Sequence, residues 1–206
     1  MKTYIILITI LLFTVDSFSQ EIKNVDFISP LHEKMAAVQS GENWGFMNAD
    51  GVYTIAPRKD LAIPLKTASQ MPYPYFSQGR VLFMEVRENI EYYGFINTTG
   101  EIAILPKYIE VTPFNEHGKA LALELFKQQL GENGILQKQM VRYVYREVVI
   151  DTTGTTVSYL KDPQHIIPMR DQMKRGVKIT SYFISDVLVA VKNNEGSWDI
   201  VNITKN

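Results

Sequence analysis

Short runs of alternating or continuous apolar residues recur along the chain, and Gly, Pro, Asn or Asp residues bound them. Four of these runs lie at residues 35–38, 80–86, 119–125 and 187–191. A large apolar residue precedes each run, and these residues are Leu31, Phe76, Phe114 and Phe183. Runs of this length between turn residues are typical of β-strands, so the pattern predicts a protein built from short antiparallel strands.

A second strand is expected after each run, and its sequence is nearly repeated. Residues 43–51 read NWGFMNADG and residues 92–100 read YYGFINTTG, with weaker copies at 150–154 (IDTTG) and 198–202 (WDIVN). Aligned in this way, Met47, Ile96, Ile150 and Val201 are equivalent, with spacings of 49, 54 and 51 residues. Four spaced copies indicate a repeated structural unit and not two copies of an active site.

The turns NADG, NTTG and DTTG are expected to lead from the second strand into a third. An Asn or Asp side chain accepts a hydrogen bond from the backbone two residues later, and Gly tolerates a positive φ. Pro57 and Pro106 are expected to end the third strand, because proline has no N–H for the ladder. Gly45 and Gly94 are expected to let another backbone or ring approach closely.

The resulting prediction is an all-β fold of about four antiparallel three-stranded meanders. The units span roughly residues 27–60, 76–113, 114–160 and 183–206 of a single domain at 20–206. One meander cannot bury its apolar face alone, so the units are expected to stack as an open array or a propeller-like ring. The fourth unit lacks a third strand, and closure of a ring is expected if residues 22–29 supply it.

Two segments interrupt the repeat. Residues 126–140 extend the third hairpin, and their Gly-Glu-Asn-Gly sequence predicts a turn at its tip. Residues 161–180 separate the third and fourth units, and the stretch 168–176 allows a short helix that ends at Gly176. Insertions in repeat proteins usually gather on one face, which is often the binding face.

The motif residues Trp44, Gly45, Phe46, Tyr93, Gly94, Phe95 and Trp198 resemble the WG-repeat (KWG-like) family, named after its Trp-Gly pair. The resemblance is good at 27–57 and 76–114, weaker at 114–160 and truncated at 183–206. The third copy has Tyr145-Arg146 or Arg146-Glu147 where the aromatic-Gly pair belongs, and the fourth has Asp199 in place of Gly. The family is common in exported or surface proteins of the Bacteroidetes, so the resemblance implies an exported all-β repeat scaffold and no chemistry.

The first residues have the layout of a secretory signal peptide. Lys2 precedes the uncharged apolar run 4–15, and Ser17 and Ser19 supply the small residues before a cleavage site. Twelve residues rise only about 18 Å as a helix, which is too short to cross a bilayer core of about 30 Å. We therefore expect a signal peptide at 1–19, no integral span after cleavage, and a periplasmic, outer-surface or secreted protein.

Composition narrows the classes of partner. The formal net charge of −1 gives no long-range attraction to nucleic acid or anionic lipid. The chain has no cysteine, so disulfides and an N-terminal lipid-modified Cys are excluded. Eleven Tyr, ten Phe and two Trp suit a sheet-rich core.

No catalytic, cofactor or metal site is predicted, and the chain is not expected to be an enzyme. The three histidines, His32, His117 and His165, lie far apart and form no metal-binding motif. The chain also lacks GxSxG, GxxxxGK[ST] and GxGxxG.

Two groups of residues remain as candidates for a binding surface. Tyr73 and Tyr75 alternate with prolines in MPYPYF, a segment that suits sugar stacking or peptide docking if the rings are exposed. Arg170, Lys174 and Arg175 form a small basic cluster. The expected function is that of a non-enzymatic module that binds an unidentified protein. The alternatives are a glycan-binding module and an immunity or inhibitor protein.

Overall fold

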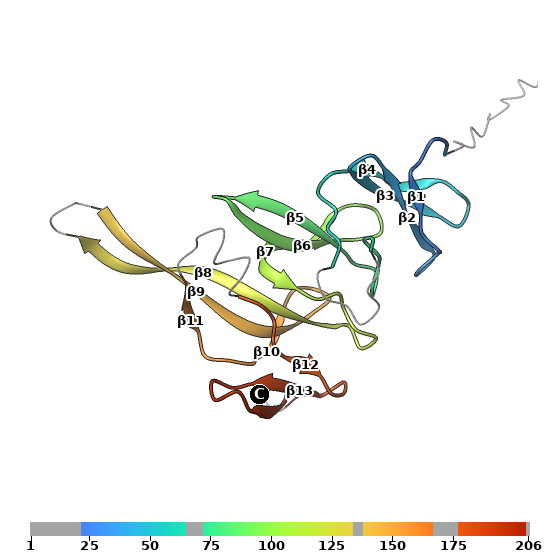
Figure 1. The fold of residues 1–206 in the computed structure, drawn as a ribbon. Coiled ribbons are helices and arrows are strands. Elements are labelled where there is room, and N and C mark those ends of the chain that lie inside the picture. The colour runs from blue at the N-terminus through green and yellow to red at the C-terminus, as the bar shows by residue number, and fades with distance from the viewer. Residues whose placement is uncertain (1–21, 65–71, 134–137, 167–176, 205–206) are drawn as a thin grey trace, which may run out of the picture.

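The computed structural model describes residues 22–64, 72–133, 138–166 and 177–204, and they form three antiparallel sheets without a helix (Figure 1). The first sheet has the order β1-β2-β3-β4, with β1 at Phe27–Ile28, β2 at Met35–Ser40, β3 at Asn43–Asn48 and β4 at Tyr53–Arg58. The third sheet has the order β12-β13-β14, with β12 at Tyr182–Phe183, β13 at Leu188–Lys192 and β14 at Trp198–Asn202. None of the three sheets closes into a barrel.

The second and largest sheet runs in sequence order from β5 to β10. Its strands are β5 (Val81–Arg87), β6 (Ile90–Ile96), β7 (Ile102–Val111), β8 (Lys119–Asn133), β9 (Lys138–Asp151) and β10 (Thr156–Tyr159). A short strand, β11 (Gln164–Ile166), pairs with β9 outside this path. We refer to β2–β4 as group 1, to β5–β7 as group 2, to β8–β10 as group 3 and to β13–β14 as group 4.

The core consists of three apolar clusters, and each lies between two successive groups. The first joins Trp44 and Phe46 of group 1 to Phe83 and Ile96 of group 2. The second lies between groups 2 and 3 and includes Leu82, Phe95, Ala122, Val148 and Ile150. The third lies between groups 3 and 4 and includes Leu121, Leu123, Val149, Val189 and Val191.

The two faces of a strand explain this arrangement. Successive side chains of a strand point to opposite faces. In β5, Val81 and Phe83 therefore join the cluster shared with group 1, whereas Leu82 joins the cluster shared with group 3. Apolar residues at consecutive positions thus let a group pack against both of its neighbours.

Each group also has a short leading strand, which the sequence-based prediction of three-stranded meanders omitted. β1 pairs with β2, and β12 pairs with β13. In group 2 the segment after β4 takes this place, because Ala62 N–H donates to Leu82 O at 3.0 Å. In group 3 the end of β7 takes it, with Val111 opposite Ala122. The third strand of groups 1 and 2 therefore continues into the leading strand of the next group.

The prolines of the third strands lie inside the strands, contrary to the expectation that they end them. β4 runs to Arg58 and β7 to Val111. The pairing register shifts opposite Gly45 and Gly94, so each third strand has a β-bulge there. Proline has no N–H group, and at a bulge this costs no hydrogen bond of the ladder. The predicted close approach at both glycines is confirmed, since a Cβ on Gly45 would lie 2.9 Å from Pro57 N.

The predicted hairpin turns are also confirmed, and two further ones were missed. Asn48, Asn97 and Asp151 each accept hydrogen bonds from the N–H groups two and four residues later. Asn115 and Asn193 do the same at NEHG and NNEG. The closing glycines of all five turns have positive φ, between 68° and 85°.

Two expectations about individual segments are wrong. The third aromatic-Gly pair was expected at Tyr145-Arg146 or Arg146-Glu147, but Glu147 and Val148 hold its positions. Glu147 precedes the turn residue Asp151 by four positions, as Tyr93 precedes Asn97. The segment 22–29 does not complete group 4, because Phe27 and Ile28 pair with β2. The expected helix at 168–176 lies outside the described residues.

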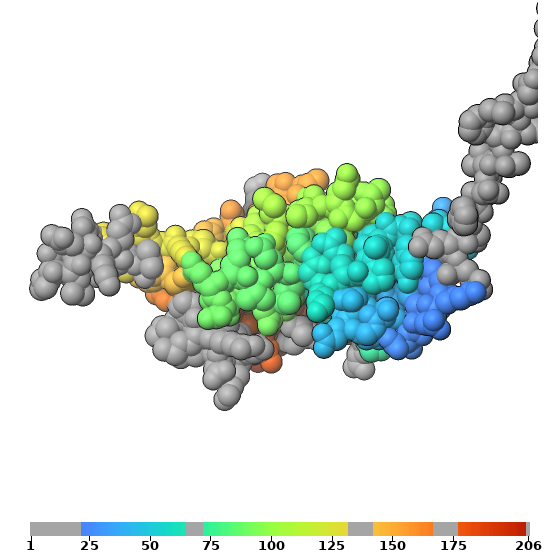
Figure 2. All heavy atoms as spheres, turned by 90° about the horizontal axis from the view of Figure 1, so that it is seen from above, coloured from blue at the N-terminus to red at the C-terminus, as the bar shows by residue number. Residues whose placement is uncertain are grey.

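The predicted long third hairpin is present as the β8–β9 ribbon. It extends well beyond the other strands, on the left in Figures 1 and 2. β8 continues to Asn133, so the first three residues of the predicted Gly-Glu-Asn-Gly turn lie in a strand, and residues 134–137 lie outside the described residues. The ribbon gives the molecule an elongated outline (Figure 2).

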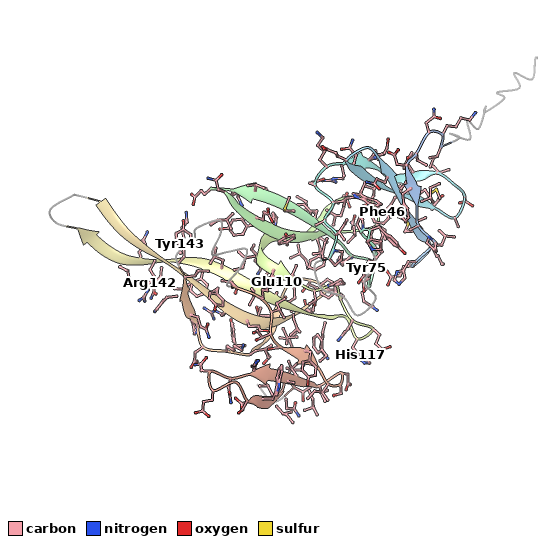
Figure 3. The ribbon with its side chains drawn as sticks, viewed as in Figure 1. Phe46, Tyr75, Glu110, His117, Arg142 and Tyr143 are labelled. Carbon is pink, nitrogen blue, oxygen red and sulfur yellow. The ribbon has the colours of Figure 1, made fainter. Side chains whose placement is uncertain are left out.

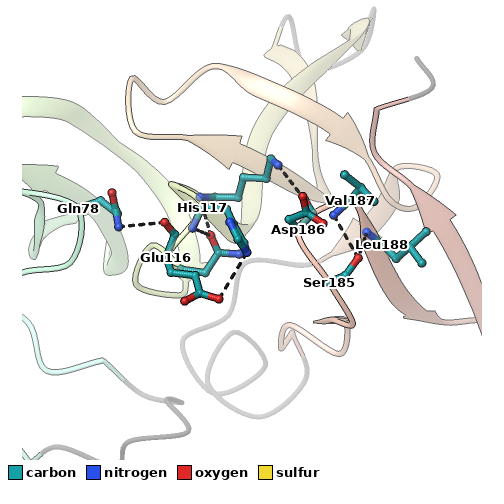
Figure 4. A network of polar contacts seen from close by, with 9 residues as sticks. Gln78, Glu116, His117, Ser185, Asp186, Val187 and Leu188 are labelled. Carbon is teal, nitrogen blue, oxygen red and sulfur yellow. Dashed lines mark hydrogen bonds and ion pairs between the residues drawn. The ribbon is translucent and has the colours of Figure 1, made fainter.

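The turns that precede the first strands are linked from group to group. Glu33 accepts hydrogen bonds from the N–H groups of Gln78 and Gly79 at 2.7 and 2.8 Å. Gln78 Nε2 donates to Glu116 O at 3.3 Å, and Lys119 Nζ donates to Asp186 O at 2.8 Å (Figure 4). Each group thus contacts the next one through equivalent turns.

Candidate functional site

The third sheet exposes an apolar face whose equivalents in the other groups are buried. Trp44 and Tyr93 hold the position of Trp198, and Phe46 and Phe95 hold that of Ile200. Trp44 is only 9% exposed and Phe46 only 1%, because the next group covers them. Trp198 is 48% exposed and Ile200 67%. No described element covers the face of β12–β14 that points away from group 3, and we call this face the end face.

Aromatic and aliphatic side chains form this end face. Tyr182 on β12 lies opposite Ala190, and Ala190 lies opposite Ile200, so the three side chains share one row. The Tyr182 and Trp198 rings contact edge to face with centroids 5.2 Å apart. Lys192 Nζ lies 5.9 Å from the centroid of the Trp198 ring. The end face thus exposes aromatic side chains, which are enriched at protein interfaces, beside an exposed isoleucine.

β14 also has an unpaired edge among the described residues. It pairs with β13 on one side, and no described strand pairs with the other side. Asn193 N–H donates to Ser197 O, and Ile203 N–H donates to Val187 O. The antiparallel alternation then directs the N–H and C=O groups of Trp198, Ile200 and Asn202 away from β13.

A pocket of about 510 Å³ lies between group 3 and the third sheet. It is wide open to solvent, and its lining is mixed. Lys161 and Lys192 supply positive charge, and Asp162 and Asp199 supply negative charge. Because the open pocket carries charges of both signs, it favours neither an anionic nor a cationic ligand, and we assign no ligand to it.

A second candidate surface lies at the base of the β8–β9 ribbon. Lys127 Nζ donates to Glu88 Oε2 at 2.8 Å, and Tyr143 Oη donates to the same oxygen at 3.1 Å. The hydrogen bonds from Lys127 and then Tyr143 lower the pKa of Glu88 below its ordinary value. Arg142 projects from the same ribbon (Figure 3) and donates to Gln128 Oε1 at 2.7 Å. These contacts join the ribbon to the loop between β5 and β6.

Arg146 is stacked between two rings on the same ribbon. Its guanidinium carbon lies 4.6 Å from the Phe126 ring centroid and 4.8 Å from that of Tyr159. Such stacking fixes the orientation of the side chain. The stacked Arg146 side chain is thus a fixed structural feature of the sheet surface, and we assign no catalytic role to it.

Two buried carboxylates tie the segment 177–181 to the large sheet. Glu110 Oε2 accepts a hydrogen bond from Ile179 N–H at 2.7 Å. Glu147 Oε1 accepts from the N–H groups of Thr180 and Ser181, and its Oε2 lies 3.1 Å from Lys161 Nζ. Their role is structural, because their oxygens are occupied by backbone N–H groups and a lysine. Neither residue was singled out from the sequence, because a charged residue within a strand does not itself indicate burial.

The tyrosines singled out from the sequence are half-buried. The Tyr73 ring packs on the first cluster, with its centroid 5.4 Å from that of Phe27. The Tyr75 ring contacts His32 edge to face at 5.6 Å. Figure 3 places Tyr75 beside Phe46, close to group 1. Tyr73 therefore contributes to the core, whereas Tyr75 contacts the exposed His32.

The other sequence candidates are widely separated or lie outside the described residues. Arg170, Lys174 and Arg175 fall in the undescribed segment 167–176. Trp44, Gly45, Phe46, Tyr93, Gly94 and Phe95 lie in groups 1 and 2 and pack in or beside the core, whereas Trp198 lies on the end face. Burial, followed by the nearby Glu91 carboxylate, raises the pKa of Tyr93 to about 12.

The described residues contain no cluster of three or more His, Asp or Glu side chains able to hold a metal ion. His117 lies at the surface, with Nε2 3.4 Å from Glu116 Oε1 (Figure 4). His32 and His165 are also exposed and lie in other parts of the molecule. Over the same residues, no helix has the length and apolar character needed to cross a membrane.

No curated protein and no solved structure matches the chain. Residues 93–124, which comprise most of β6, all of β7 and the start of β8, match the family model described as WG containing repeat.

Proposed function

We propose that this chain is an exported, non-enzymatic WG-repeat protein that binds another protein in the cell envelope or outside the cell. In this proposal the four groups are WG repeats, although the family model matches only 93–124. The repeats stack as an open array, with β1–β4 and β12–β14 at opposite ends (Figure 1). The recurring turns and the three apolar clusters between groups support this arrangement.

The exposed end face carries the proposal. Terminal units of repeat proteins usually have a polar outer face, because an apolar one is poorly soluble. Here Tyr182, Trp198 and Ile200 are each about half exposed or more on one contiguous face. Large apolar patches of this kind mark interaction sites in soluble proteins, and Trp and Tyr are enriched among interface residues that contribute most to binding.

The glycan-binding alternative has less support. Sugar stacking requires an open aromatic face. The Tyr73 ring contacts the Phe27 ring and the Tyr75 ring contacts His32, so part of each tyrosine ring is covered. The alternative predicts that replacing both tyrosines by Ala removes binding on a glycan array. An immunity or inhibitor role is one form of protein binding and is distinguished by the identity of the partner.

The proposal is tested by capture of partners from the envelope fraction of the source organism with the tagged chain beginning at Gln20. We expect one protein in stoichiometric amount that is lost with the Trp198→Ala, Ile200→Ala double variant. The matched control is the Ile102→Ala, Leu105→Ala double variant, whose apolar side chains are 55% and 70% exposed on β7. Partner capture that survives in both variants would move the binding site away from the end face.

An empty capture together with binding on a glycan array would replace protein binding by the alternative. Turnover of a defined substrate, abolished by a point substitution, would overturn the non-enzymatic assignment.

A further inference from the structure

We propose that Arg142 and Arg146, on one face of the β8–β9 ribbon, bind carboxylates of an extended acidic segment of a protein. We call this surface the arginine face and define it by the two arginines with Phe126, Tyr159 and His165. The inference goes beyond the proposed function, because it assigns a second binding surface with a ligand chemistry of its own.

The arginine face is separate from the end face. Alternate residues of a strand point to the same side, so Arg142 and Arg146 share a side of β9 with Val148. Val148 packs in the cluster between groups 2 and 3, whereas Tyr145, on the other side of β9, packs in the cluster shared with the third sheet. The arginine face therefore points away from the third sheet.

The short strand β11 brings a third side chain with ring N–H groups to the same face. His165 lies directly opposite Val144, which lies between the two arginines in the sequence. Phe126 lies opposite Val144 on the other side, in β8. His165 is exposed, and it thus lies in the row between those of Arg142 and Arg146.

The guanidinium group of Arg146 is held in place but lacks an acceptor. Its carbon lies 4.6 Å from the Phe126 ring centroid and 4.8 Å from the Tyr159 ring centroid, so aromatic rings fix the planar group. Its Nε is buried and has no hydrogen-bond partner among the described residues. Buried donors of this kind are rare in folded proteins and call for an acceptor.

Arg142 repeats this feature four residues earlier. Its Nε is also buried without a partner, although Nη2 donates to the neutral Gln128 Oε1 at 2.7 Å. Two arginines on one strand face therefore keep N–H groups that no described residue satisfies.

The charges around the arginine face favour an anionic ligand. Glu124 lies opposite Arg146, but its Oε1 is 3.3 Å from Lys107 Nζ. No described carboxylate forms an ion pair with either arginine. A guanidinium group matches the planar, two-oxygen geometry of a carboxylate and can donate two parallel hydrogen bonds to it.

The spacing of the arginines suits an extended peptide. Four residues of a strand rise about 13 Å, and this is also the distance between side chains i and i+4 of an extended segment. Side chains i, i+2 and i+4 of such a segment point to one side. Glutamates at alternate positions can therefore place one carboxylate at each arginine and a third near His165.

The probe is a fluorescent synthetic peptide, GESESEG, titrated at low ionic strength into the chain beginning at Gln20. We expect saturable binding by fluorescence anisotropy that weakens as salt is added, because salt screens exposed charges. The matched peptide GQSQSQG lacks the carboxylates and should bind at least about tenfold more weakly.

Variants of the chain test the site and not only the net charge. Arg146→Gln should weaken binding of the glutamate peptide at least about tenfold. Arg146→Lys keeps the charge but loses the two-pronged donor, and should also bind more weakly than the native chain. The control is Lys192→Gln, which removes one positive charge beside the end face and should bind like the native chain.

A measurement on the native chain keeps the test decisive if the substitutions disturb the ribbon. The nuclear magnetic resonance signal of the Arg146 Nε–H group is identified by its loss in Arg146→Lys. This signal should shift progressively as the glutamate peptide is added and should not shift with the glutamine peptide.

An unshifted Arg146 signal, or equal binding by the native chain and Arg146→Gln, would overturn the inference. Tighter binding of a single-stranded oligothymidine at the same salt concentration would also overturn it, because the face would then favour phosphates. If the peptide binds and no protein is captured from the envelope fraction, the arginine face stands and the proposed function fails. If a partner is captured and the peptide does not bind, the proposed function stands and the arginine face fails.

Discussion

Gly94 and Pro106 face each other across the β6–β7 pair so closely that a side chain on the glycine has no room. A Cβ atom on Gly94 would lie 2.8 Å from Pro106 N and 2.5 Å from Ile104 O. Gly45 and Pro57 repeat this relationship in group 1. In group 3 the glycine and the proline are both absent, and Val148 is fully buried at the equivalent position.

The first prediction concerns this contact. Gly94→Ala should destabilise the chain by about 1–3 kcal/mol, because backbone atoms that cannot rotate away must move. The measurement is urea unfolding followed by tryptophan fluorescence. The control is Thr98→Ala in the exposed turn of the same hairpin, which should stay within about 0.5 kcal/mol of the native chain. An equal effect of both substitutions would show that the close approach does not constrain the fold.

The sequence was sufficient to predict the hairpin strands of this fold. β2, β5 and β13 coincide with the predicted runs within two residues, because each run alternates or is apolar throughout and is bounded by turn residues, whereas β8 begins at the predicted residue and continues to Asn133. The turns at Asn48, Asn97 and Asp151 were predictable because the Asx hydrogen bonds are local. Local physical rules therefore account for most of the hairpins.

Leading strands and buried carboxylates were not predictable in the same way. β1 and β12 are two residues long, and the segment at Ala62 pairs through isolated contacts. Segments this short show no alternation of apolar and polar residues, so no local pattern reveals them. The position of Glu147 in the repeat was predictable, because counting back four residues from the turn residue Asp151 places it at the aromatic position. The hydrogen-bond partners of its carboxylate were not predictable, because they lie 33 and 34 residues away.

The end face also required the structure. Trp198 was recognised as a motif residue, and its two equivalents, Trp44 and Tyr93, pack in or beside the core. Exposure of Trp198 follows only from the absence of a further described group beyond β14. Position in the stack, and not residue type, therefore distinguishes the candidate site from the core.

Export predicts a defined amino terminus. When the full chain is expressed in a bacterial host, we expect cleavage after Ser19, because small residues precede the bond and the apolar run 4–15 ends shortly before it. Mass spectrometry of the periplasmic protein should give a chain that starts at Gln20. Recovery of the whole 23.6 kDa chain from the membrane fraction would contradict the prediction.

High pH should destabilise the fold through Tyr93. Its pKa is raised from 10.0 to about 12, chiefly by burial. The folded state therefore binds the phenolic proton more tightly than the unfolded state, and the stabilisation is complete below pH 10 and is lost as the pH rises through 12. Tyr93→Phe should reduce the loss of unfolding free energy across this range, as measured by urea unfolding at several pH values.

A control distinguishes this residue from the other buried phenol. Burial also raises the pKa of Tyr108, so part of the pH dependence should remain in Tyr93→Phe. The control is the double variant Tyr93→Phe, Tyr108→Phe, which should lose more of the pH dependence than Tyr93→Phe alone. If the stability of Tyr93→Phe depended on pH as that of the native chain does, Tyr93 would not be a source of the pH dependence.

The Glu88–Lys127–Tyr143 contacts should hold the base of the ribbon locally without stabilising the whole fold. Ion pairs between exposed side chains contribute little to stability, so Glu88→Gln should hardly change the free energy of unfolding. Amide hydrogen exchange near Lys127 and Tyr143 should nevertheless become faster, since one carboxylate oxygen accepts both donors. Unchanged exchange there would show that the ribbon is held by its β8–β9 ladder alone.

Glu147 should be the most sensitive polar residue of the described structure. Its side chain is 2% exposed and accepts hydrogen bonds from the N–H groups of Thr180 and Ser181. Glu147→Ala leaves these donors and Lys161 without their acceptor, and each buried unsatisfied donor costs about 1–3 kcal/mol. The control Glu85→Ala removes a half-exposed carboxylate on β5 and should change stability by less than about 0.5 kcal/mol. Because the lost bonds anchor the segment that leads into β12, hydrogen exchange in Glu147→Ala should accelerate first in the third sheet. Uniform acceleration across all three sheets would show that the carboxylate stabilises the whole stack and not the attachment of its last group.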